Sequence, residues 1–308
     1  RQARKNTMKT RATRFTATLL LLACGVAAAT EILTSAVRPG TLDNATVSGI
    51  FDLPITLEEG QWQGDPYVPG GASRPTAGLV PDVPVTGALS REGNTLPVAI
   101  LWASMGGSGN FRHLVVFNRE AAGVRSIATA LIGDRAEIRS ITITGTTIKL
   151  RVIQAGSDDP LCCPQTKVLR SWTLSGDRLL EQAPVVLGRI ALSDLDGTTW
   201  QLLQEGPEDT AIGDSIMLRT DGEKLLGTAQ CNRYQGSIRA GIASGSLTIG
   251  PLASTRKLCE DAVMQREQEF LARLGAVTRF RFDNARLVLS GAPDTDPFIL
   301  RFVPAPDQ

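Results

Sequence analysis

The chain has 308 residues, of which 42% are hydrophobic and 20% charged, and its 32 basic and 31 acidic side chains leave a formal net charge of +1. This length and composition predict two modest globular domains and exclude a disordered chain. The charge balance and the low aromatic content, 5%, argue against a nucleic-acid partner. The single histidine, His113, excludes a multi-histidine metal site and most Ser/His or Cys/His nucleophiles. We expect it to pack in the fold or lie at the surface rather than bind a ligand.

Residues 1–29 have the pattern of a secretory signal peptide. Met8 reads as the initiator, basic residues follow it, and the apolar run over 15–23 is too short to span a bilayer. The sequence Leu-Leu-Ala before Cys24 is typical of a bacterial lipobox, in which the cysteine is acylated, whereas the alanines at 27–29 would suit an ordinary signal peptidase. We expect the lipobox to be used, so that acyl chains on Cys24 hold the exported chain at the membrane.

A β-rich N-terminal domain is expected over residues 42–184, after a weakly patterned tether at 30–41. Prolines and paired glycines between 66 and 84 exclude a long regular element there. Period-two spacing of β-branched residues on both sides of Gly145 predicts a hairpin. The expected strands are 98–102, 114–117, 138–144, 148–153, 168–174 and 179–180. Residues 185–192 are expected to form a linker.

The segment 193–303 is predicted to be a second β-rich domain with one helix. The apolar residues of 260–274 have helical spacing, so one helix face should pack on a sheet, and Gly275 should be the first residue beyond the helix. The expected strands are 199–203, 216–219, 225–229, 246–249, 277–282, 287–289 and 298–302. The predicted fold class is therefore α+β, mostly antiparallel β, with two β-rich domains.

Three motifs in the second domain carry a family resemblance. They are Leu-Asp-Gly-Thr-Thr-Trp at 195–200, Gly-Thr-Ala-Gln-Cys-Asn-Arg-Tyr-Gln-Gly at 227–236 and Ile-Gly-Pro-Leu-Ala-Ser-Thr-Arg-Lys-Leu-Cys at 249–259. With the helix that follows them, they make residues 193–303 similar to the META/HslJ family of small bacterial envelope proteins. The resemblance implies a sheet with one packed helix, a link to stress response and the cell envelope, and no established enzymatic activity.

The first domain has a weaker likeness to a module that accompanies META domains in other bacterial lipoproteins. The segments 71–75 and 158–164 carry it. Relatives often hold an Asp-rich loop near residues 88–94, but here the acidic ligands are largely missing. Because calcium needs several oxygen ligands clustered in one loop, we expect no Ca²⁺ site, and we expect no other metal or cofactor.

Four cysteines follow the leader, an even number that suits disulfides in an oxidising compartment and allows three pairings. We expect Cys231 and Cys259 to form a disulfide between a hairpin end and the helix start; two separate free thiols are the alternative. Cys162 and Cys163 are adjacent, and we expect a vicinal bridge or another cross-link that fixes a turn. A redox-sensing pair and free thiols remain alternatives.

A polar cluster is expected around the Cys231–Cys259 pair, formed by Asn232, Arg233, Arg256 and Glu267. Glu267 interrupts the apolar face of the predicted helix, and a carboxylate there is costly unless it is paired. Arg256 or Arg233 is the expected partner. The cluster is interpreted as a structural ion pair with Asn232 capping a turn; a pocket for a carboxylate or a sugar hydroxyl is the alternative.

These patterns predict an exported, lipid-anchored envelope protein without catalytic residues, acting as a binding or stress-protective module. Its expected partners are the membrane and an unidentified envelope protein or small ligand. Two alternatives are a small-ligand or inhibitor module that uses the Arg/Asn region of the second domain, and a thiol-exchange enzyme that uses Cys162 and Cys163.

Overall fold

The computed structural model describes residues 42–81, 83–159, 164–203, 216–283, 285–292 and 298–305. The predicted signal peptide and tether, with Cys24, lie outside the described residues, and so do Cys162 and Cys163. All described residues belong to one compact unit. Within them, no helix combines the length and the apolar character that a membrane-spanning helix needs.

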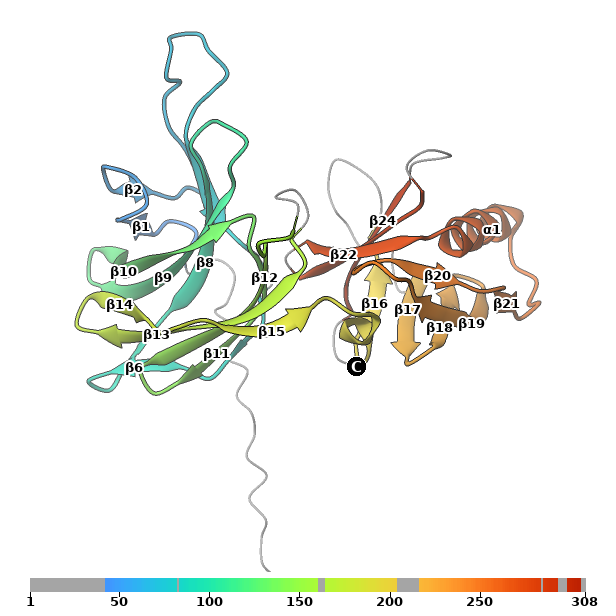
Figure 1. The fold of residues 1–308 in the computed structure, drawn as a ribbon. Helices are drawn as coiled ribbons and strands as arrows, with labels where there is room; N and C mark the ends of the chain where they lie inside the picture. Colours follow the sequence, from blue (N-terminus) through green and yellow to red (C-terminus); the bar gives the residue numbers. More distant parts are fainter. Residues whose placement is uncertain are drawn as a thin grey trace, which may run out of the picture. The chain divides into compact units, whose positions relative to one another are not determined.

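Two large sheets and a small hairpin make up the N-terminal domain (Figure 1). The first sheet has the order β2-β1-β10-β9-β8-β4-β3 and consists of β1 (Thr46–Val47), β2 (Ile55–Thr56), β3 (Gln61–Gln63), β4 (Thr76–Leu79), β8 (Val98–Ser104), β9 (Phe111–Glu120) and β10 (Gly123–Asp134). The second has the order β14-β13-β12-β11-β5, with β15 also paired to β13, and consists of β5 (Val85–Thr86), β11 (Glu137–Thr144), β12 (Thr147–Gln154), β13 (Thr166–Ser175), β14 (Arg178–Glu181) and β15 (Val185–Arg189). The hairpin pairs β6 (Leu89–Arg91) with β7 (Asn94–Leu96).

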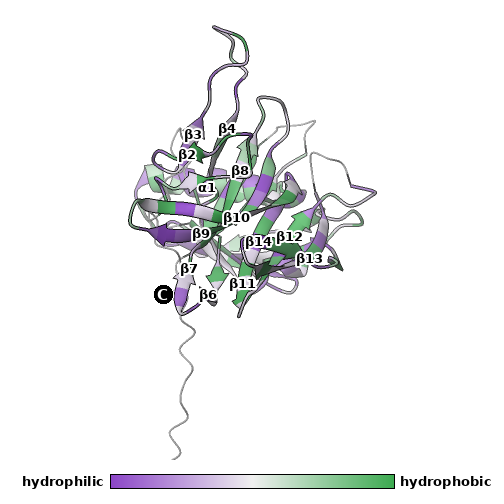
Figure 2. Ribbon diagram, turned by 90° about the vertical axis from the view of Figure 1, so that its left-hand side faces the viewer, coloured by the Kyte–Doolittle hydropathy of each residue, from purple (hydrophilic) through white to green (hydrophobic). Residues whose placement is uncertain are grey.

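The central strands of the first sheet are buried on both faces, which explains their nearly continuous apolar sequence. On β8 and β9, Ile100 and Leu114 face a core shared with the second sheet, whereas Leu101 and Val115 face a second core under β1 and β2. Figure 2 shows the hydrophobic stretch along β8 of this sheet, and others along β11 and β12 of the second sheet. Because side chains alternate across a strand, a run of apolar residues is needed to fill two cores at once.

The second domain is built on one sheet with the order β20-β19-β18-β17-β16-β24-β23-β22, preceded by a 3₁₀ turn at Leu192–Leu195. Its strands are β16 (Thr199–Leu202), β17 (Ile216–Asp221), β18 (Lys224–Ala229), β19 (Asn232–Ala240), β20 (Leu247–Ile249), β21 (Ala253–Ser254, paired with β19), β22 (Arg279–Asp283), β23 (Arg286–Ser290) and β24 (Ile299–Pro304). The ends of the sheet meet where the Leu247 amide donates to the Thr278 carbonyl at 2.9 Å and the Phe280 amide donates to the Gly245 carbonyl at 2.8 Å.

One α-helix, α1 (Asp261–Gly275), lies among the described residues. Its buried residues are Glu267, Phe270 and Leu274, and the two apolar ones join the core that the sheet encloses. Phe270 packs edge-on against Tyr234 of β19, with ring centroids 5.8 Å apart. The predicted fold class is confirmed: the chain is mostly antiparallel β, in two β-rich domains, and the second carries one packed helix.

The structure differs from the expected elements at several places, and the strands β1–β7, β19 and β21 were not among those expected. Val185–Arg189, expected within the linker, forms β15 and pairs with β13, although all five of its residues are exposed. Gly275 is the last residue of α1, and the C-cap is Ala276, with φ at −93°. The twelve-residue strand β10 was not expected, because its mixture of glycine, serine and charged residues has no clear alternation.

Candidate functional site

The predicted disulfide is present between Cys231 and Cys259, whose Cα atoms lie 6.2 Å apart. Cys231 belongs to the two-residue turn between β18 and β19, since Ala229 and Asn232 are paired across it. Gln230, the other turn residue, has φ at 74°, in the left-handed region that such tight turns use. Cys259 lies two residues before α1. The bridge therefore ties the start of the helix to the end of a hairpin.

Next to the disulfide, Asn232 and Glu267 form a buried, fully connected hydrogen-bond cluster. They are 2% and 4% exposed. The backbone amide of Asn232 donates to Glu267 Oε2 at 2.8 Å, and its Nδ2 donates to Glu267 Oε1 at 2.9 Å. Asn232 Nδ2 also donates to the Lys257 carbonyl at 3.2 Å, while Oδ1 accepts from the Lys257 amide at 2.7 Å and from Thr255 Oγ1 at 2.8 Å. Both groups thus have the partners that burial demands.

The prediction that Arg256 or Arg233 pairs with Glu267 was wrong. Arg233 and Arg256 are both exposed, and the partner of the carboxylate is Asn232. The reason is the alternation of side chains along β19: Asn232 and Tyr234 point inward, so Arg233 between them points outward. Of the four residues expected to cluster, the structure brings together only Asn232 and Glu267.

Gly227, in the motif at 227–236, is required by close packing, and Gly236 is closely packed as well. A Cβ on Gly227 would lie 2.0 Å from the Met217 carbonyl and 2.5 Å from the Tyr234 hydroxyl, which itself donates to that carbonyl at 2.9 Å. A Cβ on Gly236 would lie 2.7 Å from Leu252. Burial raises the pKa of Tyr234, so its hydroxyl stays protonated as a donor. These residues specify the packing of the domain.

A second polar arrangement flanks the segment that holds the adjacent cysteines. Burial alone would raise the pKa of Asp159, but its hydrogen-bond partners lower that pKa to about 2. Oδ2 accepts from the Gly156 amide, Thr166 Oγ1 and the Gln165 amide, and Arg189 pairs with Oδ1. The Arg189 guanidinium lies 2.7 Å from Oδ1 and comes from β15. Asp159 therefore fastens residues on both sides of 160–163 to each other and to β15.

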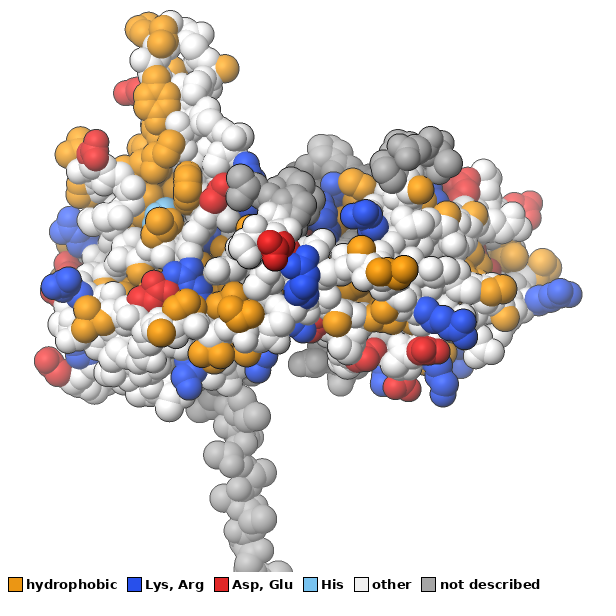
Figure 3. Space-filling model, in the orientation of Figure 1, with side chains coloured by type: hydrophobic (Ala, Val, Ile, Leu, Met, Phe, Trp, Pro, Cys, Tyr) orange, Lys and Arg blue, Asp and Glu red, His pale blue; other side chains and the backbone are white. Residues whose placement is uncertain are grey.

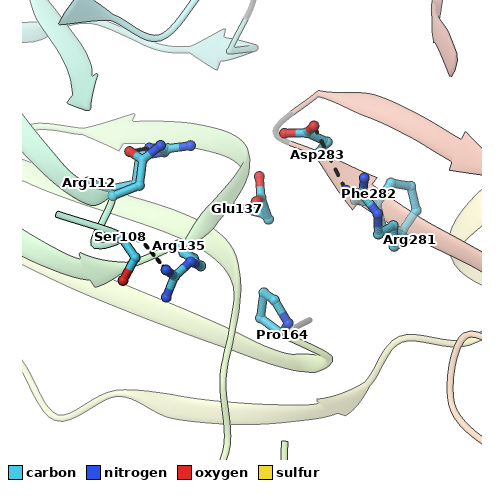
Figure 4. A pocket seen from close by; sticks show the side chains of 9 residues that line it. Ser108, Arg112, Arg135, Glu137, Pro164, Arg281, Phe282 and Asp283 are labelled. Atoms are coloured by element: carbon cyan, nitrogen blue, oxygen red, sulfur yellow. Dashed lines mark hydrogen bonds and ion pairs between the residues drawn. The ribbon is translucent and has the colours of Figure 1, made fainter. Parts of the chain in front are cut away.

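A pocket of about 260 Å³ lies elsewhere in the chain, and no pattern in the sequence predicted it. Ser108, Asn110, Arg112, Arg135, Glu137 and Pro164 of the N-terminal domain line it, together with Arg281, Phe282 and Asp283 of β22. Figure 4 shows Arg112 and Arg135 on one side, Arg281 and Asp283 on the other, and Glu137 between them. The lining is dominated by charged side chains of both signs.

Part of the pocket wall is fixed by hydrogen bonds within the N-terminal domain. Arg135 Nη1 donates to Asp134 Oδ2 at 2.7 Å, and its Nη2 donates to the Ser108 carbonyl. Arg112 Nη1 donates to the side chain of Asn110. Burial lowers the pKa of Arg112, and the carboxylates of Glu137, Asp283 and Asp134 oppose that shift. The buried guanidinium is thus held among negative charges, as burial of a cation requires.

Arg281 is bound more loosely than the other two arginines. Its Nη1 lies 3.8 Å from Asp283 Oδ2, beyond hydrogen-bond distance, and its side chain is 47% exposed. The guanidinium nitrogens that face the pocket are hydrogen-bond donors, and a carboxylate can accept hydrogen bonds from them. Of the three arginines, Arg281 is therefore the best placed to meet a ligand.

Contacts between the two domains lie beside this pocket. The Arg139 guanidinium of β11 stacks 3.7 Å from the ring centroid of Phe282 and 5.9 Å from that of Trp200. Burial lowers the pKa of Arg139 to about 10. Lys167 of β13 makes a bidentate ion pair with Asp194 at 2.8 and 2.9 Å. The first contact holds β22 against the N-terminal domain, and the second holds the 3₁₀ turn at Leu192–Leu195 against it.

His113, on β9, is 7% exposed, which agrees with the expected packing role. Burial lowers its pKa to about 4, an effect that a backbone hydrogen bond at Phe111 only partly opposes. Within the described ranges, no three His, Cys, Asp or Glu side chains are grouped as a metal site would require.

Residues 193–301 match the family model of the META domain, about a third of the chain. The predicted resemblance of the C-terminal domain is thereby confirmed, and the disulfide, the Asn232–Glu267 cluster and the packed glycines all lie within the matched segment. No curated protein and no solved structure matches the chain.

Proposed function

We propose that the chain is an exported bacterial envelope protein, anchored by lipid at Cys24, that acts as a non-catalytic binding or stress-protective module. The observation that carries the proposal is the Cys231–Cys259 disulfide, since structural disulfides persist in oxidising compartments outside the cytosol. The basic, then apolar leader that ends in Leu-Leu-Ala before Cys24 supports the same compartment independently.

The Asn232–Glu267 cluster supports a structural role for the residues around the disulfide. A catalytic carboxylate needs a free oxygen for its substrate, whereas both oxygens of Glu267 accept hydrogen bonds from Asn232. The cluster joins β19, the segment before the helix and α1 itself, so it reinforces the disulfide. A domain stabilised by a disulfide suits an oxidising compartment outside the cytosol.

The test is the mass of the protein extracted from membranes of the producing bacterium. Acylation at Cys24 predicts a mature chain that begins at Cys24 and carries the added mass of its acyl groups, and Cys24→Ser should release the protein from the membrane. A mature chain that begins unmodified at Thr30 would keep export and refute the anchor. A reduced, uncut precursor in the cytosol would refute both.

A small-ligand-binding role is the second candidate, and the pocket beside Arg281 favours it. Unlike the mostly apolar ligand sites of other proteins, it is lined chiefly by charged and polar side chains, so a ligand would be held by charge and hydrogen bonds. We place the candidate ligand site at this pocket and not at the Arg/Asn region of the META domain, because the side-chain oxygen and nitrogen of Asn232 already hydrogen-bond within the protein. A thermal-shift screen of small envelope metabolites, repeated on Arg281→Gln, tests this role.

A further inference from the structure

The loop at 64–75, which connects β3 to β4, projects from the N-terminal domain. Figure 2 shows it standing above these two strands, and Figure 3 shows hydrophobic side chains along it. Tyr67 and Val68, at its tip, are 58% and 66% exposed. The only charged residues of the loop, Asp65 and Arg74, lie near its two ends. The loop therefore presents an apolar, uncharged tip to its surroundings.

This loop is held in shape by its own hydrogen bonds and by a neighbouring loop. Three backbone amides donate across it: Gly64 to the Pro75 carbonyl at 2.9 Å, Tyr67 to the Ser73 carbonyl at 3.1 Å and Gly71 to the Val68 carbonyl at 2.8 Å. Ser73 Oγ donates to the carbonyl of Gly106, in the loop after β8, at 2.9 Å. A Cβ on Gly106 would lie 2.5 Å from that hydroxyl and 3.0 Å from the Tyr67 ring, so the two loops are in close contact. The loop is thus ordered before it meets a partner, and binding does not have to order it.

The shape and the chemistry of the tip define the surface that it fits. A projecting tip offers no concavity to a small molecule, because ligand sites are clefts or cavities. Exposed apolar side chains gain free energy when a partner removes them from water, whereas a tip without charges gains little from a charged partner. A tyrosine in such a place is typical of a membrane–water interface, where its ring lies among apolar groups and its hydroxyl stays hydrated. These properties favour the interfacial layer of a lipid bilayer over a charged protein surface.

The start of the described chain lies beside the strand that leads into this loop. The Gly60 amide donates to the Asp43 carbonyl at 2.9 Å, and β3 begins at the next residue. Leu42 follows Cys24 by 18 positions, a separation that spans at most about 60 Å when the chain is fully extended. A lipid on Cys24 therefore keeps the loop near the bilayer, at an effective concentration that makes even a weak contact significant.

We propose that Tyr67, Val68 and Pro69 insert into the interfacial layer of the membrane that carries the lipid anchor. The loop gives the exported protein a second, reversible membrane contact, which turns the N-terminal domain toward the bilayer. A lipid anchor alone fixes only the end of the chain, whereas two attachments restrict the orientation of the folded body. The inference rests on the proposed export and lipid anchoring, and it adds to them a contact made by the fold itself.

The test is co-sedimentation with lipid vesicles of the purified mature chain, residues 24–308, carrying Cys24→Ser, so that neither the leader nor a lipid contributes. One set of vesicles is pure phosphatidylcholine, and the other also contains phosphatidylglycerol, which is anionic. We expect the chain to bind both sets at millimolar lipid, with affinities equal within about twofold at low and high salt, because the tip carries no charge. Binding that needs phosphatidylglycerol and is lost at high salt would overturn the proposal in favour of charge attraction elsewhere on the surface.

Variants locate the contact. Val68→Asp should weaken vesicle binding about tenfold or more, because an apolar side chain is replaced by a charge that stays in water. Ile242→Asp is the matched control: this isoleucine is fully exposed between β19 and β20 of the second domain, so binding should not change. Both positions are exposed, so neither substitution should alter the melting temperature.

Equal effects of the two substitutions would overturn the membrane contact. The same conclusion would follow if the unsubstituted mature chain bound neither set of vesicles at millimolar lipid. The mass of the mature protein decides lipid anchoring separately, so the failure of one proposal is distinguishable from the failure of the other.

Discussion

Replacing Glu267 by glutamine tests whether the buried carboxylate is required by its hydrogen bonds. The side chain keeps its size, but one of its two acceptors becomes an NH₂ donor. Glu267 Oε2 faces the backbone amide of Asn232 at 2.8 Å and Oε1 faces Nδ2 at 2.9 Å, so either orientation places two donors against each other. Rotating the Asn232 amide does not help, because Oδ1 already accepts from the Lys257 amide.

The expected cost follows from that count. Glu267→Gln loses one charge-assisted hydrogen bond and leaves two buried donors facing each other, so the free energy of unfolding should fall by about 2–4 kcal/mol. Urea unfolding under non-reducing conditions measures the loss, and hydrogen exchange should show faster exchange at the Asn232 amide. Glu269→Gln on the exposed face of α1 is the control and should change stability by less than about 0.5 kcal/mol.

A double variant separates hydrogen bonding from charge. In Asn232→Asp/Glu267→Gln, the glutamine oxygen can accept from the backbone amide of residue 232 and its NH₂ can donate to the new carboxylate, which still accepts from the Lys257 amide. The pair should therefore be more stable than the sum of the single variants predicts, with a coupling of about 1–2 kcal/mol. If Glu267→Gln proves as stable as Glu269→Gln, or if no coupling appears, the hydrogen bonds from Asn232 do not hold the Glu267 carboxylate.

Four further predictions follow from other parts of the molecule. Reducing the Cys231–Cys259 disulfide, which closes a separation of 28 residues, should lower the stability of the META domain by about 3.5 kcal/mol in the chain-entropy model, measured by urea unfolding with and without reductant. Gly227→Ala should destabilise the domain by about 3 kcal/mol, because its Cβ would lie 2.0 Å from a carbonyl oxygen. In the control Gly275→Ala, the new Cβ meets nothing within 4 Å, so stability should stay the same or rise. Equal effects of the two substitutions would show that packing does not require Gly227. The pKa of His113 is about 4 in the folded state and 6.5 in the unfolded state, so between these pH values only the unfolded state binds the proton. About 3 kcal/mol of stability should therefore disappear as pH falls from 6.5 to 4. His113→Leu should flatten this dependence of stability on pH. Arg139→Met should remove about 1–2 kcal/mol by loss of the cation–π contact with Phe282, and an unchanged melting temperature would argue against that contact.

The local elements were predictable where the sequence carried its own periodicity. The hairpin of β11 and β12 follows from alternating β-branched residues around Gly145, and α1 follows from apolar residues at helical spacing. β15 was missed because its five residues are all exposed, so no alternation marks it; its pairing with β13 is a tertiary effect. Propensity alone cannot detect a strand that depends on its neighbour.

The site was predictable only in part, for a related reason. Asn232 and Glu267 were identified because polar residues at apolar positions demand partners, yet the partner itself was misjudged. Strand alternation turns Arg233 outward, but β19 was not among the expected strands, so this alternation could not be applied to the sequence. The pocket could not be predicted, because Arg112, Glu137 and Arg281 belong to strands that are brought together only by the tertiary fold.

The position of the pocket bears on where function resides in this chain. The META match covers only the second domain, whereas the pocket includes Glu137 and two arginines of the first domain. Arg139 and Lys167 of the first domain also contact the second. An isolated META domain would keep its disulfide and the Asn232–Glu267 cluster and would lose most of the pocket lining. The stabilising contacts of the META domain are therefore its own, whereas the pocket exists only where residues of both domains meet.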